Sequence, residues 1–259
     1  MLAVDRRHHI LERVADQQTI EVNDLARELR VSEMTIRRDI HRLERDGFVR
    51  RTYGGATAHL TRAVELAFNA RALQHAAAKR RIGMAAARLV EDASTLFVGV
   101  GTTAEHFARF LSARRNLLVV TASLPIASLL GTRSIRSVVL GGEVLREELG
   151  CSGPIALATV GRYHADVAVV GAAGVSARGG ITELEDDVAE VNRVMMERSD
   201  SVMVIADGSK LGSVARASVA SIGSGQTIVT DESAKPAELD RLRELGVRVV
   251  VAGAEETGS

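Results

Sequence analysis

The sequence predicts an α/β protein in two parts: a small N-terminal helical domain and a larger domain built on a mostly parallel sheet. The first 60 residues carry apolar side chains at helical spacing, followed by a short β-hairpin pattern. From Ile82 onward, short apolar β-rich runs alternate with helical patterns, which is typical of a parallel sheet covered on both faces. A chain of 259 residues with 46% apolar side chains is long enough for both domains.

Three helices are expected in the first domain. Apolar residues mark the first at about 5–16 and the second at about 22–29, and a short turn at Arg30-Val31 leads into the third. The third runs from Ser32 to Asp46, with Ser32 as its N-cap and Asp46-Gly47 as its end. Ile36, Ile40 and Leu43 recur at i, i+4 and i+7, so they form the buried face of this helix.

The opposite face of the third helix is rich in arginine. Between residues 30 and 51 there are seven Arg and four acids, a modest excess that by itself also fits a solvated helix. The order helix, helix, tight turn, helix favours a helix-turn-helix, whose last helix enters the major groove of DNA. After it, residues 48–52 and 56–58 predict a hairpin turned by Gly54-Gly55, able to touch phosphate or minor groove. The predicted DNA-binding residues of this winged helix-turn-helix are Ser32, Met34, Thr35, Arg37, Arg38, His41, Arg51 and Tyr53.

Composition restricts the function classes. The net charge is zero, so DNA affinity must come from a local basic patch. With no Trp and two Tyr, base stacking on single strands or RNA is not expected. Cys151 is the single cysteine and is expected to be a buried thiol, while His8-His9 do not have metal-ligand spacing. We expect a cytoplasmic protein, since no signal peptide and no run of 18 apolar residues is present. No metal and no cofactor are expected.

We expect domain boundaries at 1–59 for DNA binding, 60–80 for a linker that turns into a helix, and 81–254 for the α/β domain, with a frayed tail. Strands are predicted at 95–100, 117–121, 138–140, 167–170, 202–206, 227–230 and 247–251, and helices at 104–111, 125–130, 188–198 and 236–245.

A glycine-threonine loop follows the first predicted strand. In Gly99-Val100-Gly101-Thr102-Thr103-Ala104 the glycines allow a tight turn, and a helix N-terminus with two hydroxyls suits a phosphate. The same residues match a G-x-G-x-x-A dinucleotide pattern, but the next strand ends in Thr121-Ala122-Ser123 without the acid that would bind ribose. A small phosphorylated ligand is therefore preferred; a glycine turn without a ligand, or a nicotinamide-sensing repressor, remains open.

Other polar residues near predicted strand ends are ambiguous. Lys210 is either a phosphate partner or a surface residue, and Asp207 either holds a sugar hydroxyl or caps a turn. Arg146 either reaches phosphate or is solvated. The acidic run at 183–187 is expected to be a solvated loop leading into a helix, with cation binding as the alternative.

The N-terminal region resembles the DeoR family of bacterial repressors, whose signature runs close to V-S-x-x-T-I-R-R-D-L…L-E…G…R…G-G-A. This chain carries Val31-Ser32, Thr35-Ile36-Arg37-Arg38-Asp39-Ile40, Leu43-Glu44, Gly47, Arg51 and Gly54-Gly55-Ala56. The remainder resembles that family's effector domain, which is similar in fold to sugar-phosphate isomerases. Its matching segments are Gly101-Thr102-Thr103, Thr121-Ala122-Ser123, Gly141-Gly142, Arg146, Ser152-Gly153, Gly180-Ile181-Thr182, Ala189-Glu190-Val191, Asp207-Gly208-Ser209-Lys210 and Thr230-Asp231.

The resemblance implies a homo-oligomeric repressor of carbohydrate genes that binds double-stranded DNA and is controlled by a sugar phosphate or related metabolite. An isomerase-like enzyme is the alternative that the fold suggests. Gly99, Ala122 and Asn192 depart from the family, which often has Asp, Asn and Lys at these positions, so we expect a different effector or altered sensing. The expected effector-binding residues are Gly101, Thr102, Thr103, Thr121, Gly141, Gly142, Arg146, Asp207 and Lys210.

Overall fold

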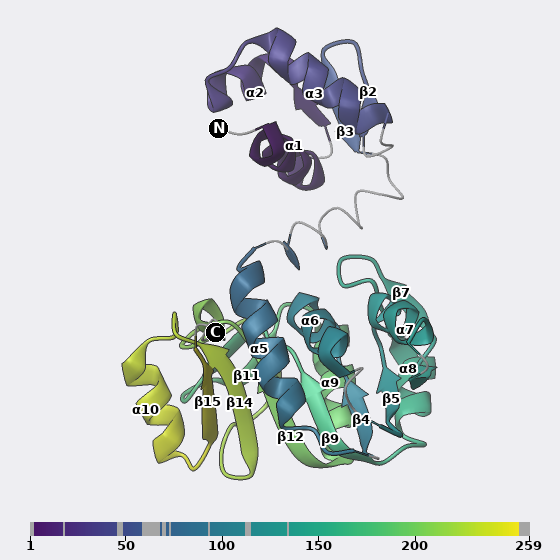
Figure 1. Ribbon diagram of the computed structural model, residues 1–259, viewed down its shortest axis with the longest axis vertical. Coiled ribbons are helices and arrows are strands. Elements are labelled where there is room, and N and C mark those ends of the chain that lie inside the picture. Colours follow the sequence, from purple (N-terminus) through teal and green to yellow (C-terminus); the bar gives the residue numbers. More distant parts are fainter. Residues whose placement is uncertain are drawn as a thin grey trace, which may run out of the picture. The chain divides into compact units, whose positions relative to one another are not determined.

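The computed structural model describes residues 3–17, 19–45, 49–58, 68, 71, 72, 74–92, 94–111, 115–133 and 135–253 (Figure 1). The chain divides into two compact units, Met1–Gln74 and His75–Ser259. Helix α5 (Ala76–Arg88) belongs to the second unit, so residues 76–80, which the sequence placed in the linker, start that unit's first helix. The expected helix end at 46–47, most of the expected linker and the tail at 254–259 lie outside the described residues.

Within residues 3–17, 19–45 and 49–58, the first unit has three helices and a small antiparallel sheet, and all three predicted helices are confirmed. They are α1 (Ala3–Gln17), α2 (Val22–Leu29) and α3 (Glu33–Arg45), and the hairpin is β2 (Val49–Arg51) with β3 (Gly55–Ala58). The apolar face expected on α3 is buried, because Ile36, Ile40 and Leu43 pack in one core with residues of α1 and α2.

A third strand that the sequence did not predict completes this sheet. Strand β1 (Thr19–Glu21) precedes α2 and pairs with β3, giving the order β1-β3-β2. Gly55 lies opposite Glu21, and a Cβ at Gly55 would lie 1.7 Å from the carbonyl oxygen of Ile20. The second glycine of the G-G-A segment is therefore required by the close approach of two strands.

The second unit contains a seven-stranded sheet in which every neighbouring pair is parallel, which confirms the predicted sheet and its seven strands. The order is β15-β14-β12-β9-β4-β5-β6. The strands are β4 (Thr95–Val98), β5 (Leu118–Thr121), β6 (Arg136–Val139), β9 (Ala165–Val170), β12 (Ser199–Ile205), β14 (Gln226–Asp231) and β15 (Arg248–Ala252).

Helices cover both faces of the sheet, because successive apolar residues of a strand point to opposite faces and both faces must be buried. One apolar cluster joins the sheet to α5, α6 (Thr102–Phe110) and α7 (Leu124–Gly131). The other joins it to α8 (Gly153–Val160), α9 (Asp186–Glu197) and α10 (Pro236–Glu244). Adjacent residues of β4 show the alternation, because Leu96 and Val98 belong to the first cluster and Phe97 to the second.

Short antiparallel elements were not predicted. Strands β7 (Glu143–Leu145) and β8 (Gly150–Ser152) form a hairpin after β6. Strands β10 (Gly174–Ser176), β11 (Gly180–Glu183) and β13 (Ala217–Ala220) form a separate sheet. A 3-10 turn at Gly208–Lys210 follows β12.

The direction in which strands are added reverses between β4 and β9. From β4 the chain adds β5 and β6 on one side, and then β9, β12, β14 and β15 on the other. Ligands of parallel α/β sheets bind outside the carboxyl ends of the strands at such a switch point. The residues that follow β4 and β9 are therefore the first place to look for an effector site.

Candidate nucleic-acid interface and ligand site

The start of α3 is fixed by a side-chain cap. Ser32 Oγ accepts a hydrogen bond from the backbone N–H of Thr35 at 3.2 Å and lies 2.9 Å from Thr35 Oγ1. The cap satisfies one of the free N–H groups at the helix start, so the first turn is held in register. Ser32 and Thr35 thus have a structural role beside the DNA contact predicted for them.

The outer face of α3 is exposed, as predicted. Met34, Arg37, Arg38 and His41 are all exposed, and Met34 is 65% accessible although its side chain is apolar. Arg37 is 3.6 Å from Glu33 one turn earlier, a weak surface pair that leaves the guanidinium free to move. The first turns of a recognition helix contact base edges, so these four side chains are in the position that this task needs.

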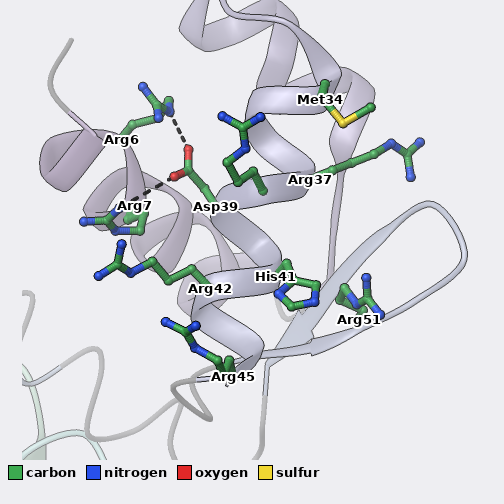
Figure 2. A pocket seen from close by; sticks show the side chains of 10 residues that line it. Arg6, Arg7, Met34, Arg37, Asp39, His41, Arg42, Arg45 and Arg51 are labelled. Atoms are coloured by element: carbon green, nitrogen blue, oxygen red, sulfur yellow. Dashed lines mark hydrogen bonds and ion pairs between the residues drawn. The ribbon is translucent and has the colours of Figure 1, made fainter.

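Arginines from three elements line one pocket of about 620 Å³ around α3, and Figure 2 shows their side chains. Such a density of cations on an exposed surface suits the phosphates of a duplex. The lining residues are seven arginines, a single acid and two others: Arg6, Arg7, Met34, Arg37, Arg38, Asp39, His41, Arg42, Arg45 and Arg51.

Asp39 is the acid in this pocket, and its role was not predicted. It is buried, with its carboxylate 2.5 Å from Arg6 Nε and 3.8 Å from Arg7 Nη1 on α1 (Figure 2). The pairs join α1 to α3 across the DNA-binding unit. The helical spacing shows that Asp39 is near the buried face, but its partners lie more than 30 residues away and could not be found from sequence.

The wing residues are held by a contact back to α3. Arg51 Nε is 2.7 Å from Glu44 Oε2, and the Arg51 backbone N–H donates to Glu44 Oε1 at 3.2 Å. Tyr53 is fully exposed at the turn of the hairpin. Arg37, Arg51 and Tyr53 line a second, smaller pocket, so wing and recognition helix share one surface.

In the second unit, the glycine-threonine loop lies where an anion site was expected. Gly101 is the N-cap of α6 with φ of 109°, a value that favours glycine, and Thr102 and Thr103 form the first turn. Thr102 is largely buried and Thr103 is partly exposed. Free N–H groups of a helix N-terminus are therefore present at the carboxyl end of β4.

Two of the expected ligand residues use their hydrogen bonds within the protein. Thr121 is completely buried; its Oγ1 donates to the Val98 carbonyl at 2.7 Å and accepts from Ser123 N–H at 3.0 Å. Asp207 is also buried and accepts from the Ser209 N–H at 3.0 Å and from its hydroxyl at 2.5 Å. These contacts tie β5 to β4 and cap the 3-10 turn, which favours the capping interpretation of Asp207.

The double glycine and Arg146 belong to the β7–β8 hairpin. Gly141 and Gly142 have φ of 71° and 103°, and a Cβ at Gly142 would lie 2.3 Å from the Ser152 carbonyl oxygen. These glycines are explained by the tight chain path alone. Arg146 is exposed in the turn of the hairpin.

The acidic run at 183–187 was predicted to be a solvated loop that leads into a helix, and only part of it is exposed. Asp186 and Asp187 are exposed in the first turn of α9, but Glu183 is the last residue of β11 and is partly buried. Burial and the nearby Glu148 raise the pKa of Glu183 from 4.5 to about 7, although backbone N–H groups and Lys210 act in the opposite direction. Lys210 therefore lies within electrostatic reach of Glu183.

Cys151 is buried, and burial raises the pKa of its thiol, as expected for a structural cysteine. Within the described residues, no three His, Cys, Asp or Glu side chains come together as a metal site would require. No helix in that part of the chain has the length and apolarity needed to cross a bilayer.

A winged helix-turn-helix unit with an arginine-lined recognition helix, joined to a parallel-sheet unit, defines a DNA-binding transcriptional regulator with its own sensor domain. Two family models support this class. Residues 6–61 match the DeoR-like helix-turn-helix domain, and residues 74–232 match the DeoR C terminal sensor domain. The chain belongs to the DeoR family of transcriptional regulators.

The matches to two curated relatives extend over nearly the whole length of both proteins. The HTH-type transcriptional repressor CsqR of Escherichia coli (strain K12) is 30% identical over 95% of this chain and 94% of its own. The glycerol-3-phosphate regulon repressor of the same strain is 30% identical over 89% of this chain and 92% of its own. Among solved structures, ribose 5-phosphate isomerase A of Methanocaldococcus jannaschii covers 51% of this chain and 52% of its own, at 20% identity and a TM-score of 0.39.

Proposed function

We propose that this regulator is a homo-oligomeric repressor that binds an operator through α3 and the wing and is controlled by a small phosphorylated metabolite. The observation that carries the DNA part is the pocket lined by seven arginines, four of them on α3 and the others on α1 and β2. Because one module spans only a half-site, a dimer or tetramer gives the usual two-fold match to an operator. Two of the relatives are named as repressors, and we propose that this protein is likewise a repressor and not an enzyme, acting in the cytoplasm.

Individual roles follow from position on the surface. Arg37 and Arg38 are proposed to contact base edges or phosphates in the major groove, with Met34 and His41 beside them. Arg51 and Tyr53 on the wing are proposed to contact the adjacent backbone.

The experiment that tests this proposal is Arg38→Ala in the full chain. Arg38 is exposed on α3, so its loss removes a DNA contact without opening the core. We expect operator affinity to fall by about tenfold and the salt slope to decrease by about one. Fluorescence anisotropy with a selected operator at several salt concentrations measures both.

Arg243→Ala is the matched control, because Arg243 is an exposed helical arginine of the second unit paired with Asp240. It should leave both quantities unchanged. Equal affinities for the wild type and Arg38→Ala would remove α3 from the DNA interface.

The effector is proposed to bind at the carboxyl ends of β4 and β9. Gly101, Thr102 and Thr103 place helix N–H groups there, and Lys210 adds a positive charge nearby. One relative is named as the repressor of a glycerol-3-phosphate regulon, which fits a phosphorylated effector for this chain too.

A further inference from the structure

Two glycines form the end of the central strand pair. Gly99 follows β4, and its N–H donates to the Val169 carbonyl of β9 at 2.9 Å. Gly171 follows β9, and a Cβ there would lie 3.3 Å from the Val100 carbonyl oxygen. Neither residue covers the switch point with a side chain. We call this place, with the side chains of Glu183 and Asn192, the switch-point site.

Asn192 is directed at this site from α9. Its side chain is 1% exposed, and a Cβ at Gly99 would lie 2.9 Å from its Oδ1 atom. The two departures from the family pattern at Gly99 and Asn192 are therefore neighbours, and a side chain at Gly99 would require the Asn192 side chain to move. The Nδ2 atom of Asn192 bonds Glu183, and no described residue donates to Oδ1, so an acceptor oxygen lies at the carboxyl end of β4.

Glu183 lies beside Asn192. Its Oε1 accepts from Asn192 Nδ2 at 3.4 Å, and the nearby backbone N–H groups of Ala173 and Leu184 favour the ionised form of its carboxyl. The Ala173 N–H donates to the Thr182 carbonyl at 3.0 Å, so the end of β11 that carries Glu183 is tied to the segment that follows β9. The charged groups that face it are Glu148 from the β7–β8 turn and Lys210 from the 3-10 turn.

The carboxyl of Glu183 and the amide of Asn192 determine which class of ligand can bind between them. An ionised carboxylate and an amide oxygen are both acceptors, so a molecule between them must bring donors. Hydroxyl groups on neighbouring carbons provide two donors at short spacing. Gly101, the N-cap of α6, lies two residues after Gly99. A phosphate at the helix N–H groups and hydroxyls at Glu183 and Asn192 therefore suit opposite ends of one molecule.

We propose that Glu183 and Asn192 bind neighbouring hydroxyl groups of a polyol phosphate at the switch-point site and so determine which effector this regulator accepts. This inference rests on the proposed function, since it assumes a phosphorylated effector. Hydrogen bonds from ligand hydroxyls favour the ionised carboxylate, so binding should release a proton from Glu183.

The test compares inorganic phosphate, glycerol 3-phosphate and ribose 5-phosphate as probes by calorimetric titration of the full chain at pH 6 and pH 8. In the wild type, we expect at least one polyol phosphate to bind about tenfold or more tightly than inorganic phosphate. Glu183→Gln should remove that preference while affinity for inorganic phosphate stays the same. The affinity ratio of wild type to Glu183→Gln should rise from pH 6 to pH 8.

Glu185→Gln is the matched control, because Glu185 lies two residues further on and is paired with Arg216 at 2.8 Å. It should keep the wild-type preference at both pH values. Asn192→Leu, which fills similar volume without acceptors, should behave like Glu183→Gln; circular dichroism shows whether each variant is folded.

The outcomes are separable. If the wild type binds polyol phosphates and Glu183→Gln binds them equally well, Glu183 is only a tether between β11 and α9 and the inference is wrong. If Glu183→Gln weakens inorganic phosphate to the same extent, it acts on the whole site and the inference is also wrong. If no probe binds the wild type, the phosphorylated effector itself is refuted, and the inference with it, while operator binding still stands.

Discussion

Asp39 is an acid in the middle of an arginine-rich surface, and its burial explains why that is tolerated. Its carboxylate pairs with Arg6 and Arg7 of α1 and does not face solvent. Removing one partner of a pair that is mostly desolvated costs more than removing an exposed one. The acid of the T-I-R-R-D segment thus fixes the position of the recognition helix and is not expected to touch DNA.

Asp39→Asn keeps the shape and removes the charge, so we expect α3 to lose about 2 kcal/mol of stability, roughly thirtyfold in opening equilibrium. Hydrogen exchange of the α3 amides in the full chain measures this. Asp24→Asn is the control, since Asp24 is well exposed and 3.7 Å from Arg27, and it should change exchange only slightly. Equal effects of both changes would show that the α1–α3 ion pairs do not stabilise the unit.

Glu183 gives the molecule a pH dependence near neutrality. Its pKa is about 7 when folded, against 4.5 as the reference value, so the folded state holds the proton more tightly. The stability from this group is fully present below pH 4.5 and is lost as pH rises through 7. The wild type should therefore lose stability between pH 5 and pH 8.

Glu183→Gln removes this titration. Relative to the wild type, its Tm should rise by roughly 3–6 °C on going from pH 5 to pH 8, as scanning calorimetry can measure. Glu185→Gln should run parallel to the wild type. A Tm difference between Glu183→Gln and wild type that stays constant with pH would contradict the raised pKa.

At the scale of elements, the wing depends on a strand that precedes α2. β1 and β3 approach so closely at Gly55 that a Cβ would overlap the Ile20 carbonyl, whereas a Cβ at Gly54 would meet nothing within 4 Å. Of the two adjacent glycines, only Gly55 is therefore required by a close approach of the backbone.

Gly55→Ala should separate β1 from β3, destabilising the wing by about 2 kcal/mol and lowering operator affinity about tenfold or more. Gly54→Ala is its matched control and should be close to neutral. Hydrogen exchange of β1 and β3, with anisotropy on operator DNA, distinguishes the two variants. Comparable losses in both would mean that turn flexibility, and not strand approach, requires glycine here.

The sequence predicted the elements that have strong periodicity. All seven strands of the parallel sheet were predicted from short apolar runs, which are most completely buried in central strands such as β4 and β9. The edge strands β6 and β15 are partly exposed. Strands β1, β7, β8, β10, β11 and β13 have only three or four residues, too few for a periodic pattern to identify them, so pairing with partner strands defines them. Helix α8 begins with Gly153-Pro154, which has the composition of a turn.

The same limit applies to the sites. Arg37, Arg38 and His41 could be placed on an exposed face because a helix has a fixed period. Glu183 and Asn192 lie nine residues apart on a strand and a helix, and only the fold brings them together. Thr121 ends a strand and was expected to bind the effector from the family resemblance, and only the structure shows that its hydroxyl is also bonded to its neighbours in space.

At the scale of the whole molecule, the proposal requires that a ligand in one unit changes DNA binding by the other. Thr102 is the first residue of α6, where a negative charge favours the helix but repels a phosphate. Thr102→Asp should abolish the Tm shift caused by a bound sugar phosphate and make operator affinity insensitive to it. Thr102→Ser, which keeps the hydroxyl, should retain both responses.

Thermal shift and anisotropy on the same preparations measure the two responses. A Tm shift that survives in Thr102→Asp would place the effector elsewhere. If Thr102→Asp loses the Tm shift but its operator affinity still responds to the sugar phosphate, the site that stabilises the protein differs from the site that regulates DNA binding.

The reversal between β4 and β9 also has a consequence for biosynthesis. β4 leaves the ribosome before β5 and β6, but its other neighbour, β9, begins only at Ala165. Until β9 is synthesised, the backbone N–H and C=O groups on that edge of β4 have no partner strand, and the sheet is incomplete. The DNA-binding unit ends at Gln74 and is synthesised much earlier. A nascent chain can therefore carry a folded DNA-binding unit while its sensor unit is incomplete and able to misfold or to bind chaperones.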